Sequence, residues 1–361
     1  MTKVWTLEVR KDALGTARVT ETALSALGEG ETLIEVENFG LTANNVTYGL
    51  VGEQIGYWQF FPASEAGWGI IPVWGFGRVI QSRSDDLEEG ERLFGYFPMG
   101  THLRLTPSRR SGQIMDQTPH RQGLPAAYNR YRLIAEDPPV VREREAQRAI
   151  LFPLFATSYV IADWLQDNAY FGAEQVVVTS ASSKTGLGVG MALGMLEGAP
   201  RSIGVTSPAN EDFVSATSAF GAVASYGDID TLPQAKTALI DMSGNAEVIT
   251  AVHERMGEGL VVSSIVGATH WDAERQQRPL PGAKPTVFFA PTQIEKRDKE
   301  LGGGAILLRA LTAWAEMSDA LADHLIIERH TGPQAVQSVW EDMVAGRVTP
   351  DRGIFASMRK D

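Results

Sequence analysis

The sequence predicts an α/β protein in which a doubly wound parallel sheet is joined to a second, β-rich domain. From residue 149 onward, short strands alternate with helices, and the run "QVVVTSAS" is continuously apolar, as in a parallel strand buried on both faces. Before residue 106, "TLIEVENFGLT" and "IPVWGFGRVIQS" alternate at period two and closely spaced glycines and prolines mark turns, which favours a compact barrel. A chain of 361 residues is long enough for both domains.

The composition and net charge of the chain argue against several classes of protein and of binding site. The net charge of -12 argues against a nucleic-acid-binding or membrane-binding surface. The N-terminal stretch "MTKVWTLEVRKDALG" has no apolar leader, so we expect a cytoplasmic protein without membrane spans. There is no cysteine, which excludes disulfides, thiolate nucleophiles and zinc sites built on sulfur. No two histidines have the close spacing of a metal site, so no metal is expected.

The segment 106–148 differs from its surroundings because it is polar and interrupted by prolines. It is typical of a long surface loop, a linker or a lid. After residue 149 the expected elements follow in order: a helix at "AILFPLFATSYVIADWLQDN", then strands and helices in alternation as far as the strand "PTVFFAP". The tail adds a strand at "HLIIERHTG", a helix at "PQAVQSVWEDMVAG" and an extended end.

The turn after the first parallel strand is the strongest candidate for a ligand site. Its residues are Ser180, Ala181, Ser182, Ser183, Lys184, Thr185 and Gly186. Unpaired N–H groups and the helix dipole attract anions at such a strand-to-helix turn. Here serines stand where glycines usually bring the backbone to a diphosphate, and we expect their hydroxyls and the ammonium group to replace those contacts. The alternative is an ordinary strand–helix corner with a serine N-cap.

The end of the second strand bears on the choice of cofactor. An NAD-binding strand usually ends in an acidic residue that binds the ribose hydroxyls. Here Thr206, Ser207 and Asn210 occupy that region, and the first acidic residues, Glu211 and Asp212, fall in the following helix. A 2′-phosphate would meet no carboxylate there, so the sequence favours NADP(H) over NAD(H).

The order of these elements resembles the medium-chain dehydrogenase/reductases, in their zinc-free quinone oxidoreductase branch. The similarity rests on "ETLIEVENFGLTANNVTYGLVG", "IPVWGFGRVIQSRSDDLEEGERLFGYF", "EQVVVTSASSKTG" and "GVTSPANEDFVSATSAFGAVASYGDI". It implies a GroES-like catalytic domain made of residues 1–148 and 320–361, a Rossmann domain at 149–319, and an active cleft between them. The turn "SASSKTG", the extra segment 106–148 and "NNVTYG" depart from the family pattern, as in an uncharacterised bacterial subfamily.

The resemblance also implies roles for single residues in cofactor binding. The matched positions, besides those of the turn and the second strand, are Thr157, Tyr226, Ser243, Gly244, Gly267, Ala268, Thr269, Phe288 and Phe289. Thr157 would approach the nicotinamide, and Tyr226 would meet the 2′-phosphate. Each has a structural alternative: a helix threonine can bond its own i-4 carbonyl, and strand aromatics are often core.

Catalysis would then need a donor for the developing oxyanion or enolate. The candidates in the loop that resembles the cleft lining are Asn45, Tyr48 and Tyr57, and Tyr128 and Asn129 would reach the cleft if the extra segment were a lid. The prediction is therefore a metal-free NADP(H)-dependent reductase of a small activated carbonyl or alkene, such as a quinone or enone, and the resemblance implies a homodimer. The alternatives are a dinucleotide-binding sensor or scaffold and a Rossmann protein for another nucleotide.

Overall fold

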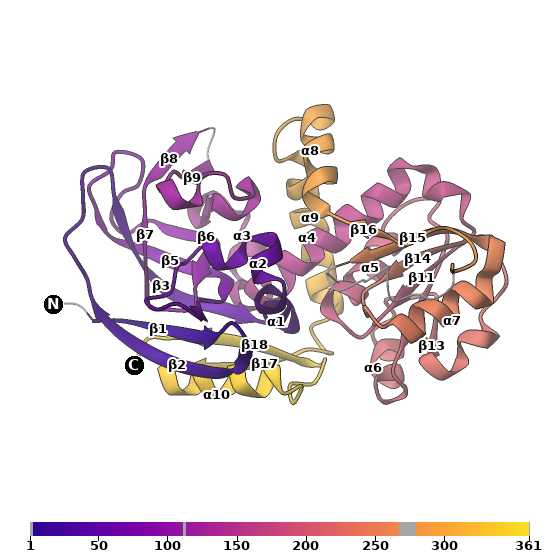
Figure 1. Cartoon of the computed structure of the whole chain (residues 1–361). Helices are drawn as coiled ribbons and strands as arrows, with labels where there is room; N and C mark the ends of the chain where they lie inside the picture. Colours follow the sequence, from indigo (N-terminus) through magenta and orange to yellow (C-terminus); the bar gives the residue numbers. More distant parts are fainter. Residues whose placement is uncertain (1–2, 111–112, 267–278, 361) are drawn as a thin grey trace. The chain divides into compact units, whose positions relative to one another are not determined.

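The computed structural model describes residues 3–110, 113–266 and 279–360. Contacts within the chain divide it into two compact units (Figure 1). Residues Met1–Ile150 and Ile326–Asp361 form one, called here the terminal unit, and Leu151–Leu325 form the other, the central unit. The sequence-based boundaries were 148/149 and 319/320. Each unit is described separately.

The terminal unit is built on two sheets. Within the described residues, the smaller sheet has the order β2-β1-β4, and the larger runs β17-β18-β3-β5-β6-β10-β9-β8 with β7 also paired to β3. The strands are β1 (Lys3–Arg10), β2 (Ala13–Ala23), β3 (Thr32–Leu41), β4 (Trp68–Gly69), β5 (Pro72–Ser82), β6 (Arg92–Pro98), β7 (His102–Leu105), β8 (Pro107–Arg110), β9 (Gln113–Asp116), β10 (Arg130–Leu133), β17 (Ile326–Thr331) and β18 (Arg352–Ser357). The helices are α1 (Ala43–Leu50), α2 (Gly52–Ile55), η1 (Tyr57–Gln59), η2 (Pro119–Arg121), η3 (Ala126–Asn129), η4 (Ile134–Glu136), α3 (Pro139–Arg142) and α10 (Pro333–Val344).

The alternating apolar side chains of β3 lie on the face of the larger sheet that packs against the core of the terminal unit. Ile34 and Val36 are buried in the core of the terminal unit, and so are Phe39 and Leu41 farther along the strand. The pairing of β3 with β5 shifts register between Val36 and Asn38. An irregularity of one residue moves the inward positions from even to odd numbers, which keeps apolar side chains on one face.

The C-terminal helix α10 joins the end of the chain to its beginning. Trp340 is fully buried, and its indole N–H donates to the Leu14 carbonyl of β2 at 2.8 Å. A buried indole needs such an acceptor. This contact explains why residues from both ends of the sequence belong to one unit.

The segment 106–148 is not a long loop, linker or lid. It forms β8, β9 and β10, which extend the larger sheet beyond β6. Arg121, 1% exposed, pairs with the buried Asp116 at 2.8 Å and donates to the Tyr131 hydroxyl at 3.0 Å. Strands of four residues are too short to show a period-two pattern, and β10 pairs with β6 from a distant part of the chain, so the sequence alone did not indicate them.

The central unit contains a parallel sheet with the order β13-β12-β11-β14-β15-β16 in the part of the chain that the structure describes. The strands are β11 (Gln175–Thr179), β12 (Arg201–Thr206), β13 (Ala222–Ser225), β14 (Thr237–Asp241), β15 (Leu260–Val266) and β16 (Thr286–Phe288). The helices are α4 (Glu145–Asp167), which begins in the terminal unit, η5 (Ala169–Gly172), α5 (Lys184–Gly194), η6 (Pro208–Asn210), α6 (Glu211–Ala216), η7 (Tyr226–Thr231), α7 (Ala246–Met256), η8 (Gly257–Gly259), α8 (Ala290–Leu301) and α9 (Ala305–Ala320). This alternation confirms the predicted α/β class with a doubly wound parallel sheet.

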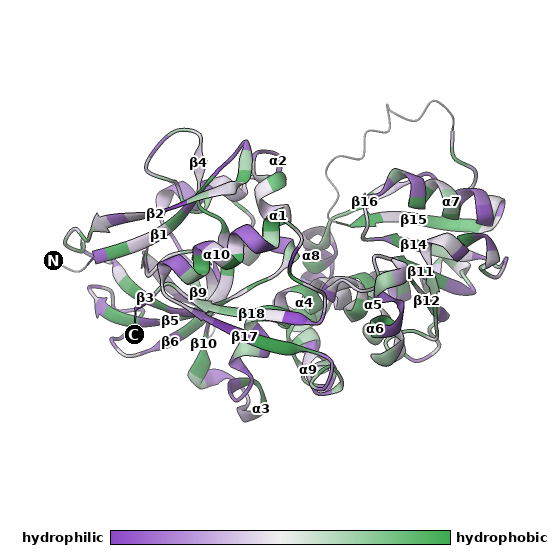
Figure 2. Cartoon of the chain, turned by 90° about the horizontal axis from the view of Figure 1, so that it is seen from below, coloured by the Kyte–Doolittle hydropathy of each residue, from purple (hydrophilic) through white to green (hydrophobic). Residues whose placement is uncertain are grey.

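Both faces of this sheet are covered. Val177 of β11 and Leu239 of β14 belong to one apolar cluster with Val248 and Val252 of α7. Figure 2 shows β15 as a mostly hydrophobic strand, as expected where helices cover both faces. Gly188 of α5 allows a close approach to α4, because a Cβ atom there would lie 2.6 Å from the Ser158 hydroxyl oxygen.

Two helices after β16, α8 and α9, were not expected from the sequence. Arg297 of α8 binds both carboxylate oxygens of Asp163 on α4, at 2.8 and 2.9 Å, and so fixes α8 to the central unit. Helix α4 is long and apolar enough to cross a membrane by length and composition, contrary to expectation, yet 61% of its most apolar window is buried inside the structure. This burial is typical of a core helix.

The segment 106–148 is called here the inserted segment, and its buried ion pair between Arg121 and Asp116 generates a stability prediction. Arg121→Met is expected to lower the free energy of unfolding by about 3–5 kcal/mol, because the carboxylate of Asp116 then stays buried without its partner. The measurement is urea unfolding followed by tryptophan fluorescence. Arg109→Met is the control, since its ion pairs with Glu91 and Glu136 are on the surface and contribute about 1 kcal/mol or less. Equal losses in the two variants would contradict the assignment.

Candidate functional site

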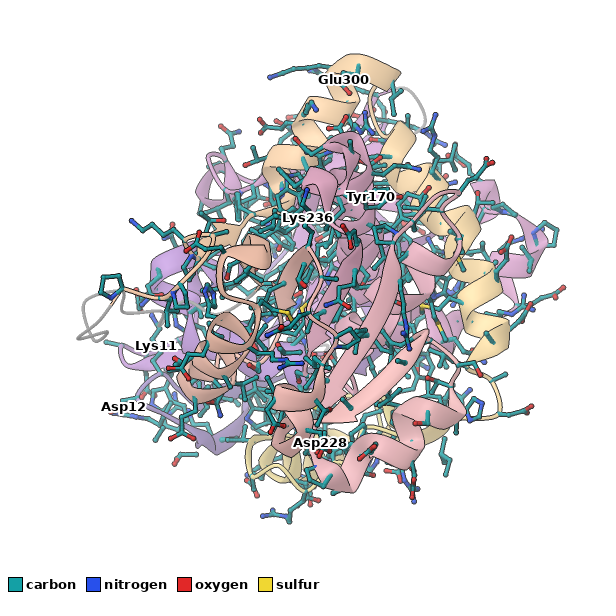
Figure 3. All side chains as sticks on the ribbon, turned by 90° about the vertical axis from the view of Figure 1, so that its right-hand side faces the viewer. Lys11, Asp12, Tyr170, Asp228, Lys236 and Glu300 are labelled. Carbon is teal, nitrogen blue, oxygen red and sulfur yellow. The ribbon has the colours of Figure 1, made fainter. Side chains whose placement is uncertain are left out.

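The candidate cofactor site is the carboxyl edge of the parallel sheet. Parallel strands end at the same edge, so Thr179, Thr206, Ser225 and Asp241 are the last residues of four neighbouring strands. Figure 3 shows Asp228, which follows β13, at one end of this sheet, and Lys236 and Tyr170 at the other. Strands β12 and β13 lie on one side of β11, and β14 lies on its other side, so the strand order reverses at β11. Ligands of open α/β sheets bind at such a switch point.

The turn between β11 and α5 has the backbone shape that a glycine usually supplies. Ser180 adopts a left-handed conformation with φ of 49°, and its N–H donates to the Tyr226 hydroxyl at 3.1 Å. Gly186 lies against this turn: a Cβ atom there would be 2.7 Å from the Ser180 carbonyl oxygen. The turn therefore has a positive φ at its first position although that position is a serine.

The hydroxyl oxygens of the next two serines, Ser182 and Ser183, accept hydrogen bonds, whereas their hydroxyl hydrogens have no assigned acceptor among the described residues. Ser182 accepts hydrogen bonds from Thr206 and from the Asn210 amide, both at 3.1 Å. Ser183 is the N-cap of α5 and accepts from the Gly186 N–H at 3.0 Å. A hydroxyl has two acceptor sites and one donor, so Ser182, with both acceptor sites filled, can only donate to a further partner. This suits an anionic ligand beside the start of α5.

A second set of polar contacts fixes the end of β14. Asp241 is fully buried, and its carboxylate accepts hydrogen bonds from the Thr179 hydroxyl, from the Ser243 N–H and hydroxyl, and from the Gly244 N–H at 2.9 Å. Ser243 and Gly244 thus form a turn after β14 that is closed by their hydrogen bonds to Asp241. Thr179 and Asp241 were not singled out in the sequence, where a threonine and an aspartate at strand ends give no signal of contact.

The other expected cofactor residues occupy the same unit in different settings. Lys184 and Thr185 begin α5, and Ser207 is the first residue after β12. Burial raises the pKa of Tyr226, and the hydrogen bond from Ser180 opposes this. The Thr157 hydroxyl donates to the i-4 carbonyl of Pro153 at 3.4 Å, the structural alternative for this residue.

The remaining matched positions lie farther along the chain. Phe288 ends β16, and its ring centroid lies 5.3 Å from that of Trp164. Phe289 is 49% exposed. Gly267, Ala268 and Thr269 lie outside the described residues.

Two of the candidate donors of the terminal unit, Tyr48 and Tyr57, lie in a group of four tyrosines. This group, Tyr48, Tyr57, Tyr96 and Tyr128, is called here the tyrosine cluster. The ring centroids of Tyr48 and Tyr57 are 4.5 Å apart, and those of Tyr96 and Tyr128 are 4.8 Å apart. The hydroxyls of Tyr57 and Tyr128 are hydrogen-bonded at 3.0 Å. Phe60, Phe61 and Trp74 pack around the cluster, so polar phenol groups are gathered inside an apolar environment.

Burial raises the pKa of every phenol in the tyrosine cluster. Desolvation penalises the charged phenolate, and the nearby phenols add to this effect. These hydroxyls are therefore protonated over the whole physiological range and can act as hydrogen-bond or proton donors. Tyr96 contributes a buried hydroxyl without a hydrogen-bond partner among the described residues.

Asn45, the third candidate donor, has its amide engaged by the backbone. Its Oδ1 accepts from the Thr42 N–H at 2.8 Å, and its Nδ2 donates to the Pro72 carbonyl at 3.0 Å. The first contact belongs to the capping box of α1. Both polar atoms of the Asn45 amide thus have partners in the backbone, whereas Tyr48 and Tyr57 lie in the tyrosine cluster.

No metal-binding group emerges from the part of the chain that the structure describes. Its histidines, aspartates and glutamates do not gather in threes or more in a way that could hold an ion. His253, for example, is buried, and its ring is engaged by Ser263 at 2.8 Å and by the Pro281 carbonyl at 2.9 Å.

The left-handed conformation of Ser180 generates a stability prediction. Ser180→Gly is expected to raise the free energy of unfolding by about 1 kcal/mol, since a residue with a Cβ atom is strained at positive φ and glycine is not. Thermal unfolding followed by circular dichroism measures the effect. Ser207→Gly is the control, because Ser207 has φ of -71° and gains nothing from glycine. A loss of stability in Ser180→Gly would show that its side chain stabilises the turn more than the strain costs.

Comparison with solved structures confirms the expected fold. CurA from Vibrio vulnificus matches with a TM-score of 0.62 at 13% identity, covering 99% of each chain. The Etr1p/NADP/crotonyl-CoA complex matches with a TM-score of 0.61 at 13% identity, over 99% of this chain and 100% of that one. The quinone oxidoreductase from Coxiella burnetii matches with a TM-score of 0.56 at 13% identity, over 99% and 100%.

The chain thus has the fold of the medium-chain dehydrogenase/reductases, a Rossmann unit together with a GroES-like unit. A search of curated proteins gave no match. A family profile matches residues 39–349, which is most of the chain. The chain belongs to the family described as protein of unknown function, DUF2855.

Proposed function

We propose that this protein is an NADP(H)-dependent oxidoreductase that reduces an activated carbonyl or alkene, such as a quinone or enone, without a metal ion. The observation that carries the proposal is the arrangement of Ser182 and Ser183 at the start of α5. Their oxygens accept hydrogen bonds from Thr206, Asn210 and Gly186, which directs their own hydrogens elsewhere. We assign those hydrogens to the cofactor diphosphate.

The diphosphate assignment is supported by the physics of the turn. The first N–H groups of α5 have no i-4 carbonyl to bond, and the helix dipole adds a partial positive charge at the same end. Hydrogen bonds from hydroxyls to a charged phosphate oxygen are stronger than those to neutral acceptors. Small hydroxyl side chains can therefore take over part of the role of bare glycine backbone.

The preference for NADP(H) is supported by the groups that follow β12. Thr206, Ser207 and Asn210 carry no negative charge, whereas an NAD-binding strand commonly ends in a carboxylate. The Tyr226 hydroxyl accepts from Ser180 and keeps its own hydrogen, so it can donate to a phosphate oxygen. We assign it to the 2′-phosphate.

For the chemical step we assign the donor to Tyr57, with Tyr48 beside it. NADP(H), when bound, supplies the hydride. The phenol of Tyr57, held neutral by burial, polarises the carbonyl of the substrate and gives its proton to the enolate or alkoxide that forms. The surrounding aromatic side chains Phe60, Phe61 and Trp74 exclude water and suit an apolar substrate.

Structures with the same fold are in keeping with this reaction class. One of them is CurA in complex with NADPH, another is an Etr1p complex with NADP and crotonyl-CoA, and a third is a quinone oxidoreductase. At 13% identity they support the cofactor and reaction class of the proposal without carrying it. A homodimer and a cytoplasmic location stay predictions from the sequence. The exposed apolar residues Val287 and Phe289 of the edge strand β16 and its end suit such a dimer.

Cofactor binding is tested by calorimetric titration with NADPH and NADH. We expect NADPH to bind more tightly than NADH and to raise the melting temperature, because a ligand of the native state stabilises it. Ser182→Ala is expected to weaken NADPH binding about 10- to 100-fold, the contribution of a hydrogen bond to a charged group.

Ser202→Ala is the matched control for this experiment. Ser202 lies at the amino end of β12, where it accepts from the Gly221 N–H, and its loss is expected to leave NADPH affinity unchanged. A protein whose melting temperature does not respond to NADPH would instead be a Rossmann protein for another nucleotide.

Catalysis is tested by NADPH oxidation across a panel of quinones and enones. Tyr57→Phe is expected to lower kcat about 100-fold or more while leaving NADPH affinity unchanged, because it removes the proton donor and keeps the ring. Turnover by the wild-type protein is expected to survive dialysis against EDTA. NADPH binding without oxidation of any compound would favour the sensor or scaffold alternative.

A further inference from the structure

Tyr128 reaches the tyrosine cluster from the inserted segment, the part of the chain that departs from the family pattern. Its hydroxyl is hydrogen-bonded to that of Tyr57 at 3.0 Å, although the two residues are 71 positions apart. Its ring packs edge-on against Tyr57 and Phe60, with centroid distances of 5.6 and 5.5 Å. The sheet extension of β8, β9 and β10 thus places a phenol against the assigned proton donor.

The inserted segment fixes the position of Tyr128 through the backbone. Arg121 donates to the Tyr128 carbonyl at 2.9 Å, and the Asn129 amide donates to the Arg121 carbonyl at 2.9 Å. Arg121 is itself fixed by the buried carboxylate of Asp116 at 2.8 Å. A buried, paired guanidinium leaves this turn little freedom, so the phenol of Tyr128 is held in one place.

We propose that Tyr128 is a positioning residue that donates a hydrogen bond to the Tyr57 oxygen and thereby directs the Tyr57 proton toward the substrate. This inference rests on the proposed function. If Tyr128 donates, the hydrogen of Tyr57 must point away from it, because a hydroxyl has a single hydrogen. Without Tyr128, the Tyr57 hydroxyl is free to rotate.

Burial is the main cause that raises the pKa of both Tyr57 and Tyr128, and a neighbouring phenol adds to the effect for each. Both hydroxyls therefore keep their hydrogens and either can donate across the 3.0 Å contact. The other ionisable groups facing the pair are Tyr48 and Tyr96. Arg121 lies over the Phe60 ring at 5.5 Å, and His120 is hydrogen-bonded to the Phe60 carbonyl at 3.2 Å.

The hydrogen bond matters most when the proton has left Tyr57. The substrate then carries the added hydride and the added proton, and Tyr57 is a phenolate in an apolar environment. The hydrogen bond from Tyr128 stabilises this phenolate until water returns the proton. A hydrogen bond that strengthens along the reaction raises kcat without changing substrate affinity.

The test compares Tyr128→Phe, Tyr57→Phe and the double variant with the wild-type protein. Tyr128→Phe keeps the ring and is expected to lower kcat about tenfold, with KM and NADPH affinity within twofold of wild type. The solvent deuterium isotope effect on kcat is expected to increase, because proton donation becomes slower. The double variant is expected to be no slower than Tyr57→Phe alone, since Tyr128 acts only through Tyr57.

Thr118→Val is the control for a structural loss in the same segment. It removes a hydroxyl that donates to Asp116 at 2.6 Å, so it is expected to lower the melting temperature and leave the isotope effect unchanged. An active wild-type protein with an unaltered Tyr128→Phe variant, or with additive losses in the double variant, would overturn this inference alone. Absence of any turnover by the wild-type protein would overturn the proposed function and this inference together.

Discussion

The constraint on which the rest of the central unit depends is the turn from β11 into α5. A strand buried on both faces becomes a helix within four residues, and every polar group in that space needs a partner. The Tyr226 hydroxyl accepts a hydrogen bond from the Ser180 N–H, and the Ser183 hydroxyl accepts one from the Gly186 N–H. Thr206 and Asn210 donate to the Ser182 hydroxyl. The neighbouring strands β12 and β13 thus end in groups that complete this turn.

This arrangement explains how serines can stand where glycines are usual. Glycine serves two purposes in such a turn: it permits positive φ and it exposes backbone N–H groups to a ligand. Ser180 meets the first requirement at a cost in strain, with φ of 49°. For the second requirement we propose the hydroxyl hydrogens of Ser182 and Ser183, whose oxygens already accept hydrogen bonds inside the protein.

The main feature of the terminal unit is the tyrosine cluster, whose phenols burial keeps neutral. Four tyrosines share an apolar environment in which a phenolate is costly, so each remains a donor. The inserted segment contributes one of them and fixes it with the buried pair of Arg121 and Asp116. A segment that is polar in sequence therefore has one of its ion pairs, Arg121 with Asp116, buried inside the unit, where it fixes the turn that carries Tyr128.

The sequence by itself determined the α/β class, the alternation of strands and helices from β11 to β16 and the turn at Ser180–Gly186, because local periodicity and residue size fix those features. It did not reveal the strands β8, β9 and β10 or the contacts Thr179–Asp241 and Tyr57–Tyr128, in which partners 62 and 71 residues apart meet. Only the tertiary structure decided those, since pairing between distant segments depends on register and packing, which leave no periodic signal in either segment.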